Sequence, residues 1–214
     1  MDDDAQRFVM NLENGIDKKF GDNLKKDVKL SNYSWFNLGG CAEYFYKPKD
    51  KNQLIDFLVE AKKINLESII VGAGSNTLFR DNGVKGAVIK LGKGFSEIKL
   101  IGQDILEVGA ATLDRNIANF AKKHNLGNLE FLSCIPGSLG GAIIMNSGCY
   151  DNDMSQVLVS LKAIDKNKLI ETEIRKEDIK FFYRGTNISE NLIIISAKLK
   201  GKIKKKKEKK KKKK

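Results

Sequence analysis

The chain has 214 residues, with 39 Lys and Arg against 27 Asp and Glu, which gives a formal net charge of +12. Much of this excess lies in residues 202–214, which are mostly lysine, so the sequence excludes a uniformly basic nucleic-acid-binding domain. Hydrophobic residues make up 41% of the chain, which excludes a wholly disordered protein, and no apolar run approaches the roughly 18 residues that cross a bilayer. The N-terminus is acidic where a secretion signal would be basic, so we expect a folded cytoplasmic protein.

Cysteine and histidine usage argues against disulfide and metal chemistry. The three cysteines, Cys41, Cys134 and Cys149, form no C-x-x-C pair, so we expect small buried thiols and no disulfide framework or zinc site. The single histidine, His124, follows a helical pattern among lysines, and we expect it at the exposed end of a helix. We therefore expect no metal site, and catalysis by a Ser-His or Cys-His pair is disfavoured.

The first half of the chain predicts a βαβ-like unit behind an N-terminal helix. Apolar residues four apart indicate an amphipathic helix over residues 5–20, within an N-terminal helical segment that we assign to residues 1–29. Residues 50–63 predict a second helix, because Asp50 is a suitable N-cap and the apolar side chains lie on one face. Short apolar runs predict strands over residues 42–47, 68–71 and 87–91.

The second half predicts more strands than helices. One helix is expected over residues 112–124, and strands are expected over residues 105–108, 157–164, 169–174 and 191–199. We therefore expect an α+β fold in two lobes, the first at residues 30–94 and the second at residues 95–201. Residues 202–214 are predicted to be a disordered lysine tail, because like charges repel and nothing apolar can collapse.

A glycine-rich loop follows the strand predicted at residues 68–71. In Val71-Gly72-Ala73-Gly74-Ser75-Asn76, backbone N–H groups could approach an anion with no side chain in the way. The dinucleotide-binding fingerprint needs a third glycine where Thr77 stands and a helix directly afterwards, whereas residues 79–83 indicate a turn. The loop therefore predicts a phosphate site outside the Rossmann class, with a plain tight turn as the open alternative.

Two further segments carry polar chemistry. In Ile135-Pro136-Gly137-Ser138-Leu139-Gly140-Gly141-Ala142, the proline sets a turn, Gly137 permits an unusual φ, and the glycine pair begins a short helix. The N-terminus of such a helix suits a pyrophosphate or a flavin edge, although close packing of small residues is the alternative. In Phe181-Phe182-Tyr183-Arg184, the arginine could clamp a carboxylate or phosphate, or lie on the surface beside a strand.

Together, these segments closely resemble the UDP-N-acetylenolpyruvoylglucosamine reductase (MurB) family. The matching segments occur in family order: FNLGGCA at 36–42, GAGSNTL at 72–78, DNGVKG at 81–86, LEFLSCIPGSLGGA at 129–142, MNSG at 145–148 and YR at 183–184. The resemblance implies a two-lobed α+β FAD-binding region of the vanillyl-alcohol-oxidase/PCMH type, with most of the substrate-binding domain absent. It also implies that NADPH reduces FAD, which reduces the enolpyruvyl group of a UDP-sugar to give UDP-N-acetylmuramate for peptidoglycan synthesis, in a monomer with no specific nucleic-acid partner.

The resemblance also implies roles for individual residues. Arg184 matches the family arginine that steadies the substrate carboxylate, and Tyr183 beside it is implied to shape the substrate site. The residues implied to bind FAD are Gly72, Ala73, Gly74, Ser75, Asn76, Thr77, Ile135, Pro136, Gly137, Gly140, Gly141, Ala142, Asn146 and Gly148.

The chain departs from the family pattern at its C-terminal end. Family members continue into a further domain that supplies a general-acid serine and a glutamate, and no residue here matches either. The lysine run at 202–214 stands where that domain would begin, which favours a truncated or frame-shifted sequence over a functional basic tail. Three alternatives to a complete reductase stay open: an FAD-binding fragment without full activity, another FAD oxidase on the same scaffold, and a non-enzymatic module with a polycationic tail.

Overall fold

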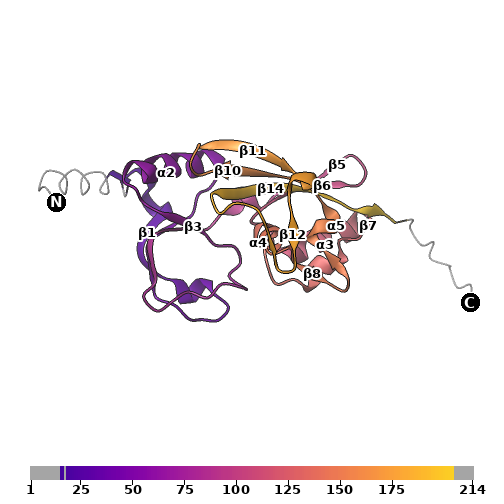
Figure 1. Cartoon of the computed structure of the whole chain (residues 1–214), viewed down its shortest axis with the longest axis horizontal. Coiled ribbons are helices and arrows are strands. Elements are labelled where there is room, and N and C mark those ends of the chain that lie inside the picture. The colour runs from indigo at the N-terminus through magenta and orange to yellow at the C-terminus, as the bar shows by residue number, and fades with distance from the viewer. Residues whose placement is uncertain (1–14, 17, 205–214) are drawn as a thin grey trace, which may run out of the picture.

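The computed structural model describes residues 15–16 and 18–204, which build two sheets and the helices packed on them (Figure 1). The helix predicted over residues 5–20 falls largely outside this part of the chain, and its described residues, 15–16 and 18–20, are helical. None of the helices in the described part of the chain has the length and hydrophobicity of a membrane span.

A four-stranded sheet and one helix form the first lobe. Its elements are η1 (Gly21–Asn23), β1 (Leu24–Lys29), η2 (Leu30–Tyr33), β2 (Cys41–Tyr46), α2 (Lys51–Lys63), β3 (Ser68–Ile70), β4 (Val84–Ile89) and η3 (Lys93–Phe95). The strand order is β1-β2-β4-β3, with β1 antiparallel to β2 and β4 parallel to both β2 and β3. The predicted βαβ-like unit is confirmed, with β4 inserted between the two strands that α2 connects.

Helix α2 forms because its sequence carries both a start signal and an apolar face. The Asp50 carboxylate accepts a hydrogen bond from the backbone N–H of Gln53 at 2.9 Å, which confirms the predicted N-cap. On the buried face, the Phe57 ring stacks on Tyr46 with 4.1 Å between ring centroids. The same core includes three side chains of the second sheet, Ile164, Ile193 and Ile195. Helix α2 therefore joins the two lobes through a shared core.

A five-stranded sheet with helices on one face forms the second lobe. Its main elements are β5 (Ile98–Ile101), β6 (Ile105–Gly109), α3 (Asp114–Lys123), η4 (Glu130–Cys134), α4 (Leu139–Ile144), α5 (Met154–Val157), β10 (Leu158–Asp165), β11 (Ile170–Arg175), η5 (Lys176–Asp178) and β14 (Leu192–Lys200). Neighbouring strands are antiparallel in the order β11-β10-β14-β6-β5. Three short pairs complete it: β7 (Leu126–Gly127) with β15 (Lys202–Ile203), β8 (Gly148–Cys149) with β9 (Asn152–Asp153), and β12 (Phe181–Phe182) with β13 (Gly185–Thr186).

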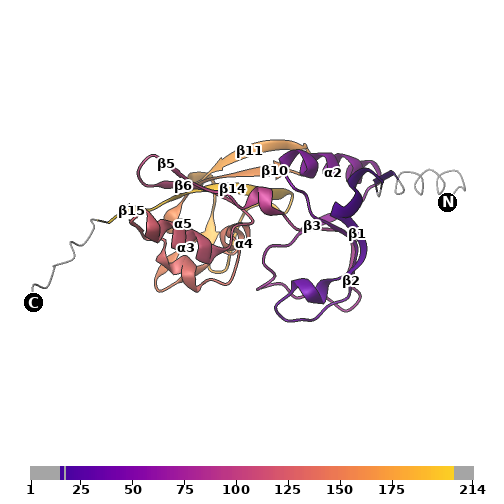
Figure 2. The same cartoon turned by 180° about the vertical axis from the view of Figure 1, so that it is seen from behind.

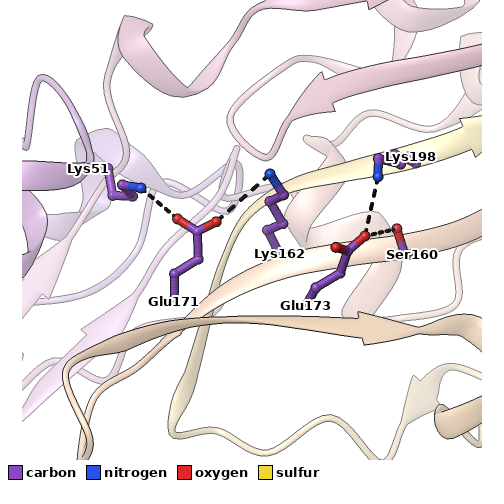
Figure 3. A network of polar contacts seen from close by, with 6 residues as sticks. All are labelled: Lys51, Ser160, Lys162, Glu171, Glu173 and Lys198. Carbon is purple, nitrogen blue, oxygen red and sulfur yellow. Dashed lines mark hydrogen bonds and ion pairs between the residues drawn. The ribbon is translucent and has the colours of Figure 1, made fainter. Parts of the chain in front are cut away.

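One face of the five-stranded sheet is apolar, and the other is polar except where Ile164 and Ile193 join the core around α2. One face packs against the apolar side chains of α3, α4, α5 and η4. On the polar face, Glu173 accepts a hydrogen bond from Ser160 at 2.8 Å and pairs with Lys198 at 3.3 Å (Figure 3). Glu171 pairs with Lys51 of α2 at 2.7 Å, which adds a polar link between the lobes. This division follows from strands that present alternate side chains to the core and to water.

Two strands differ from the sequence-based expectations. Strand β1 was not predicted, because its sequence LKKDVK carries lysines that hide any apolar alternation, and its pairing with β2 defines it. Strand β15 pairs with β7, and the backbone N–H of Lys204 donates to the carbonyl oxygen of Asn125 at 2.8 Å. The prediction of disorder is therefore wrong for residues 202–204, whose partner strand is distant in sequence; residues 205–214 lie outside the described chain.

The expectation of buried thiols is also wrong. Cys41 and Cys134 are exposed, and Cys149 is half-buried. Small size does not decide burial here, because Cys134 ends a surface 3₁₀ turn and Cys149 lies in a short surface hairpin. His124, in contrast, is the exposed C-cap residue of α3, as predicted.

Candidate functional site

The loop that follows β3 is held in place by the segment that precedes β2. Gly74 has a φ of +76°, and a Cβ atom there would overlap the carbonyl oxygen of Tyr33. The Gly74 carbonyl oxygen accepts a hydrogen bond from the Trp35 N–H at 3.0 Å, and the Ser34 hydroxyl donates to the carbonyl oxygen of Thr77 at 2.6 Å. No helix follows the loop within the described residues 71–83, which agrees with the exclusion of a Rossmann fingerprint.

This loop leaves backbone donors free. Among the described residues, the N–H groups of Ala73, Gly74 and Ser75 donate no hydrogen bond. The carbonyl oxygen of Gly72 accepts one from the Lys90 ammonium, which places a positive charge behind the loop. Burial lowers the pKa of Lys90, as does the charge of Lys47. Free N–H groups backed by a lysine can receive an anion, and Lys90 is a residue that sequence reasoning missed.

The second glycine motif begins α4, and its N-terminus is partly used by the protein itself. The N–H groups of Leu139 and Gly140 donate to the carbonyl oxygens of Thr112 and Ala110, at 3.0 and 2.9 Å. These two groups are therefore not available to a pyrophosphate, contrary to the expectation of an open helix N-terminus. Gly141 differs, because a Cβ atom there would meet no other atom within 4 Å. The exposed face of α4 at Gly141 has room for the edge of a planar ligand.

Gly137 is required for space, and the structure does not use the unusual φ that a glycine permits at this position. Its φ does not lie in the left-handed region. A Cβ atom at this position would lie 2.7 Å from the Oδ2 atom of Asp114. Asp114 is fully buried, and within the described chain neither of its carboxylate oxygens has a hydrogen-bond partner. Burial raises the pKa of Asp114 to about 7, so the carboxyl group that contacts this motif is largely neutral in mildly acidic solution.

The two glycine motifs lie in contact although they belong to different lobes. A Cβ atom at Gly72 would lie 2.7 Å from the Ser138 hydroxyl oxygen, and Ser138 is the N-cap residue of α4. Figure 2 shows α4 on the side of the second lobe that faces the first. Absence of a side chain at Gly72 therefore permits the first loop to approach α4. Sequence spacing could not predict this contact, because it depends on how the lobes pack.

The arginine motif reaches the other end of α4. Tyr183 and Arg184 form the two-residue turn between β12 and β13, both are exposed, and Arg184 has a φ of 62°. The Asn146 amide donates to the carbonyl oxygen of Phe182 at 3.2 Å, and the Thr186 hydroxyl donates to that of Ile144 at 3.2 Å. The hairpin is thus held at the C-terminal end of a six-residue helix whose N-terminal end touches Gly72.

The remaining predicted site residues divide into two groups. Ser75, Asn76 and Thr77 lie in the first loop, and Ile135 and Pro136 lead into α4, close to the contact between the lobes. The second group contacts other parts of the protein and consists of Ala142, Asn146 and Gly148. Ala142 is buried in the core, the Asn146 side chain also accepts from the Ser155 N–H at 3.0 Å, and Gly148 packs against β9. No group of three or more potential metal ligands occurs among the residues that the structure describes.

Comparison with known proteins identifies the fold of this site. Residues 42–172 match a family described as "FAD binding domain". The chain belongs to the FAD binding domain family. It is 42% identical over 199 residues to the UDP-N-acetylenolpyruvoylglucosamine reductase of Pelagibacter ubique (strain HTCC1062), covering 92% of this chain and 63% of that protein. It is 41% identical over 186 residues to the enzyme of the same name from Orientia tsutsugamushi (strain Ikeda), covering 85% and 60%.

A solved structure supports the same relationship. The UDP-N-acetylenolpyruvylglucosamine reductase (MurB) of Thermus caldophilus matches with a TM-score of 0.74 and 27% identity, covering 85% of this chain and 64% of that chain. The chain is therefore a homologue of these reductases and has the predicted α+β FAD-binding fold of the PCMH type. It spans less than two thirds of the length of the relatives that it matches.

Two features of the residues present suit parts of an FAD molecule. The free N–H groups at Ala73, Gly74 and Ser75 suit a pyrophosphate, and the open space at Gly141 suits a flat ring system. The Asp114 carboxyl group does not reach the position of such a ligand, because it is buried beneath Gly137.

Proposed function

We propose that this chain is the FAD-binding part of a UDP-N-acetylenolpyruvoylglucosamine reductase that uses NADPH. The observation that carries the proposal is the contact between the two glycine motifs, which puts the loop with free backbone donors against the N-cap of α4, three residues before the open position at Gly141. Identity of 42% over 199 residues to a reductase of this name supports the substrate class. A bound flavin would supply hydride transfer from NADPH to the enolpyruvyl group of the UDP-sugar.

The chain's own residues have three tasks in this proposal. The loop at residues 72–77 holds the pyrophosphate through backbone N–H groups, with the Lys90 ammonium behind it. The face of α4 at Gly141 positions the ring system. Arg184 binds the substrate carboxylate and stabilises negative charge that builds there, because a guanidinium offers two parallel donors.

The proton that the reaction requires is not assigned to a residue of this chain. The family's general-acid serine and glutamate have no match here, and the chain spans less than two thirds of its relatives' length. Flavin binding and flavin reduction are accordingly the properties proposed for these residues, and full turnover belongs to the whole protein.

Absorbance spectroscopy of the purified 214-residue chain tests the proposal directly. After FAD is added and the unbound excess removed, we expect an oxidised-flavin spectrum that bleaches with NADPH under anaerobic conditions. Colour that returns on addition of the enolpyruvyl UDP-sugar would extend the proposal to full turnover. A protein that is folded by circular dichroism and retains no flavin would refute it.

A glycine substitution separates the flavin site from the stability of the fold. Gly141→Ala adds a methyl group into space that no other atom of the described chain occupies, and it raises the helix propensity of α4 by up to about 1 kcal/mol. We expect unchanged or higher stability together with weaker FAD binding. Gly15→Ala is the matched control, since a Cβ atom there also meets nothing. Equal FAD affinity in the wild-type chain and both variants would remove Gly141 from the proposed site.

A further inference from the structure

The lysine that follows β4 is bonded to the first glycine loop, although it lies outside that loop in the sequence. Ile89 pairs with Ile70 where β4 runs beside β3, so the next residue, Lys90, lies beside the start of the loop. The half-buried Lys90 side chain donates a hydrogen bond from its ammonium to the carbonyl oxygen of Gly72. Among the described residues, no carboxylate forms an ion pair with this ammonium. Lys90 therefore bonds to the loop backbone, where a lysine would more often meet an acidic side chain.

This hydrogen bond fixes the direction of one peptide group. A trans peptide is planar, and its C=O and N–H bonds point in opposite directions. The oxygen of the Gly72–Ala73 peptide points to Lys90, so the N–H of Ala73 points away from Lys90. Within the described chain that N–H donates no hydrogen bond. A cation on one side of the peptide thus directs a free donor to the opposite side.

The next peptide but one in the loop has the same arrangement. The Gly74 carbonyl oxygen accepts a hydrogen bond from the Trp35 N–H at 3.0 Å, while the N–H of Ser75 has no acceptor in the described part of the chain. The two donors to the loop differ in charge, because Trp35 uses its backbone and Lys90 uses an ammonium. Charged hydrogen bonds are stronger than neutral ones, and a bonded oxygen polarises its own peptide, which makes the Ala73 N–H the better donor.

Lys47 is a second lysine at the same edge of the sheet, and its ammonium is directed elsewhere. It follows β2, beside β4, where the Lys90 N–H donates to the carbonyl oxygen of Tyr46 at 2.9 Å. The Lys47 ammonium lies 3.4 Å from the Tyr33 hydroxyl and 5.1 Å from the centroid of the same ring. Burial lowers the pKa of Lys90, and the nearby charge of Lys47 lowers it further. The two lysines are therefore close enough to share one electrostatic environment, but they contact different groups.

We propose that Lys90 is a positioning residue of the anion site, whose ammonium holds the Gly72–Ala73 peptide so that the Ala73 N–H faces the diphosphate group of the cofactor. The identity of that anion rests on the proposed function. The new element is that a side chain outside the loop sets the direction of a backbone donor within it. Without the ammonium, this peptide must be ordered when the anion binds, and that ordering lowers the affinity.

Titration of FAD into the full chain, followed by flavin fluorescence, compares Lys90→Met with Lys47→Met. Each variant removes one positive charge from the same edge of the sheet, but only Lys90→Met removes the hydrogen bond to Gly72. We expect Lys90→Met to weaken FAD binding by about tenfold or more and Lys47→Met by about threefold or less. Lys90→Arg keeps a charged donor and should recover most of the affinity. Equal losses in the two methionine variants would mean that Lys90 acts only through its charge, which would overturn the proposal.

Nuclear magnetic resonance of the ligand-free chain tests the same orientation without flavin. Inorganic pyrophosphate should shift the Ala73 amide signal in the wild-type chain and in Lys47→Met, whereas Lys90→Met should need about ten times more pyrophosphate or more. Circular dichroism checks each fold, and Lys90→Gln replaces Lys90→Met if that variant does not fold. A wild-type chain that responds to pyrophosphate through Lys90 but retains no FAD would contradict the proposed function alone. A folded wild-type chain whose Ala73 amide does not respond, or an equal response in both methionine variants, would overturn the role of Lys90.

Discussion

Substitution of the buried Asp114 by asparagine should abolish one specific part of the pH dependence of stability. Asp114 is fully buried, its two carboxylate oxygens lack hydrogen-bond partners within the described chain, and burial raises its pKa from 3.8 to about 7. Between these values the folded chain holds a proton that the unfolded chain has released. The free energy of unfolding therefore falls as the pH rises from about 4 to about 7.

The size of this effect follows from the shift in pKa. A shift of about 3 units at about 1.4 kcal/mol per unit corresponds to about 4 kcal/mol at most, fully developed above pH 7. Asparagine has nearly the same shape and no charge, so Asp114→Asn should match the wild-type chain near pH 4. At pH 8 the variant should be more stable, by up to about 4 kcal/mol.

Urea unfolding followed by circular dichroism, repeated from pH 4 to pH 8, measures this difference. Other titrating groups contribute equally to both proteins, so the informative quantity is the variant minus the wild type at each pH. Asp178→Asn is the matched control, because Asp178 is exposed on η5, and its difference should stay flat. A flat difference for Asp114→Asn would refute the argument that this carboxyl group is buried without partners.

Three other substitutions test the substrate arginine, the hydrogen bonds that hold its hairpin, and the N-cap of α2. In the whole protein, Arg184→Ala should leave NADPH-dependent bleaching of the flavin intact and slow its reoxidation by the enolpyruvyl substrate by about a hundredfold or more, and equal loss of both half-reactions would contradict the role of Arg184. Asn146→Ala removes the amide that holds the Phe182 carbonyl and the Ser155 N–H, so in the whole protein it should slow flavin reoxidation more than it weakens FAD binding, measured by flavin fluorescence. Asp50→Ala should lower the free energy of unfolding by about 1 kcal/mol through loss of the α2 cap, with no change in FAD affinity.

The elements that the sequence predicted correctly are those whose signals are local. The α2 helix has its cap at Asp50 and its apolar face within one segment, and the loop at residues 72–77 lacks the following helix that a Rossmann fold requires. Strand β1 and the pairing of β15 escaped prediction, because lysine-rich strands have no apolar alternation and become strands only through a distant partner.

Residues that act through packing could not be found from sequence patterns. Lys90 lies behind the first glycine loop because β4 runs beside β3, and Asp114 encloses its carboxyl group beneath Gly137 because α3 packs against the second motif. The sequence indicated only that Gly137 permits an unusual φ, whereas the structure shows that a side chain there would contact Asp114. A lysine or aspartate in isolation carries no sign of such burial, so its environment comes only from the fold.

The family, the α+β class and the order of the motifs could be predicted without a structure, because they depend on residue identity and spacing along the chain. Which motifs touch could be learned only from the packing of the lobes. Tertiary packing brought Gly72 of the first lobe against Ser138 of the second, and it held the Arg184 turn at the far end of α4. The physical reason is that these contacts arise from a core shared between lobes, which no local pattern encodes.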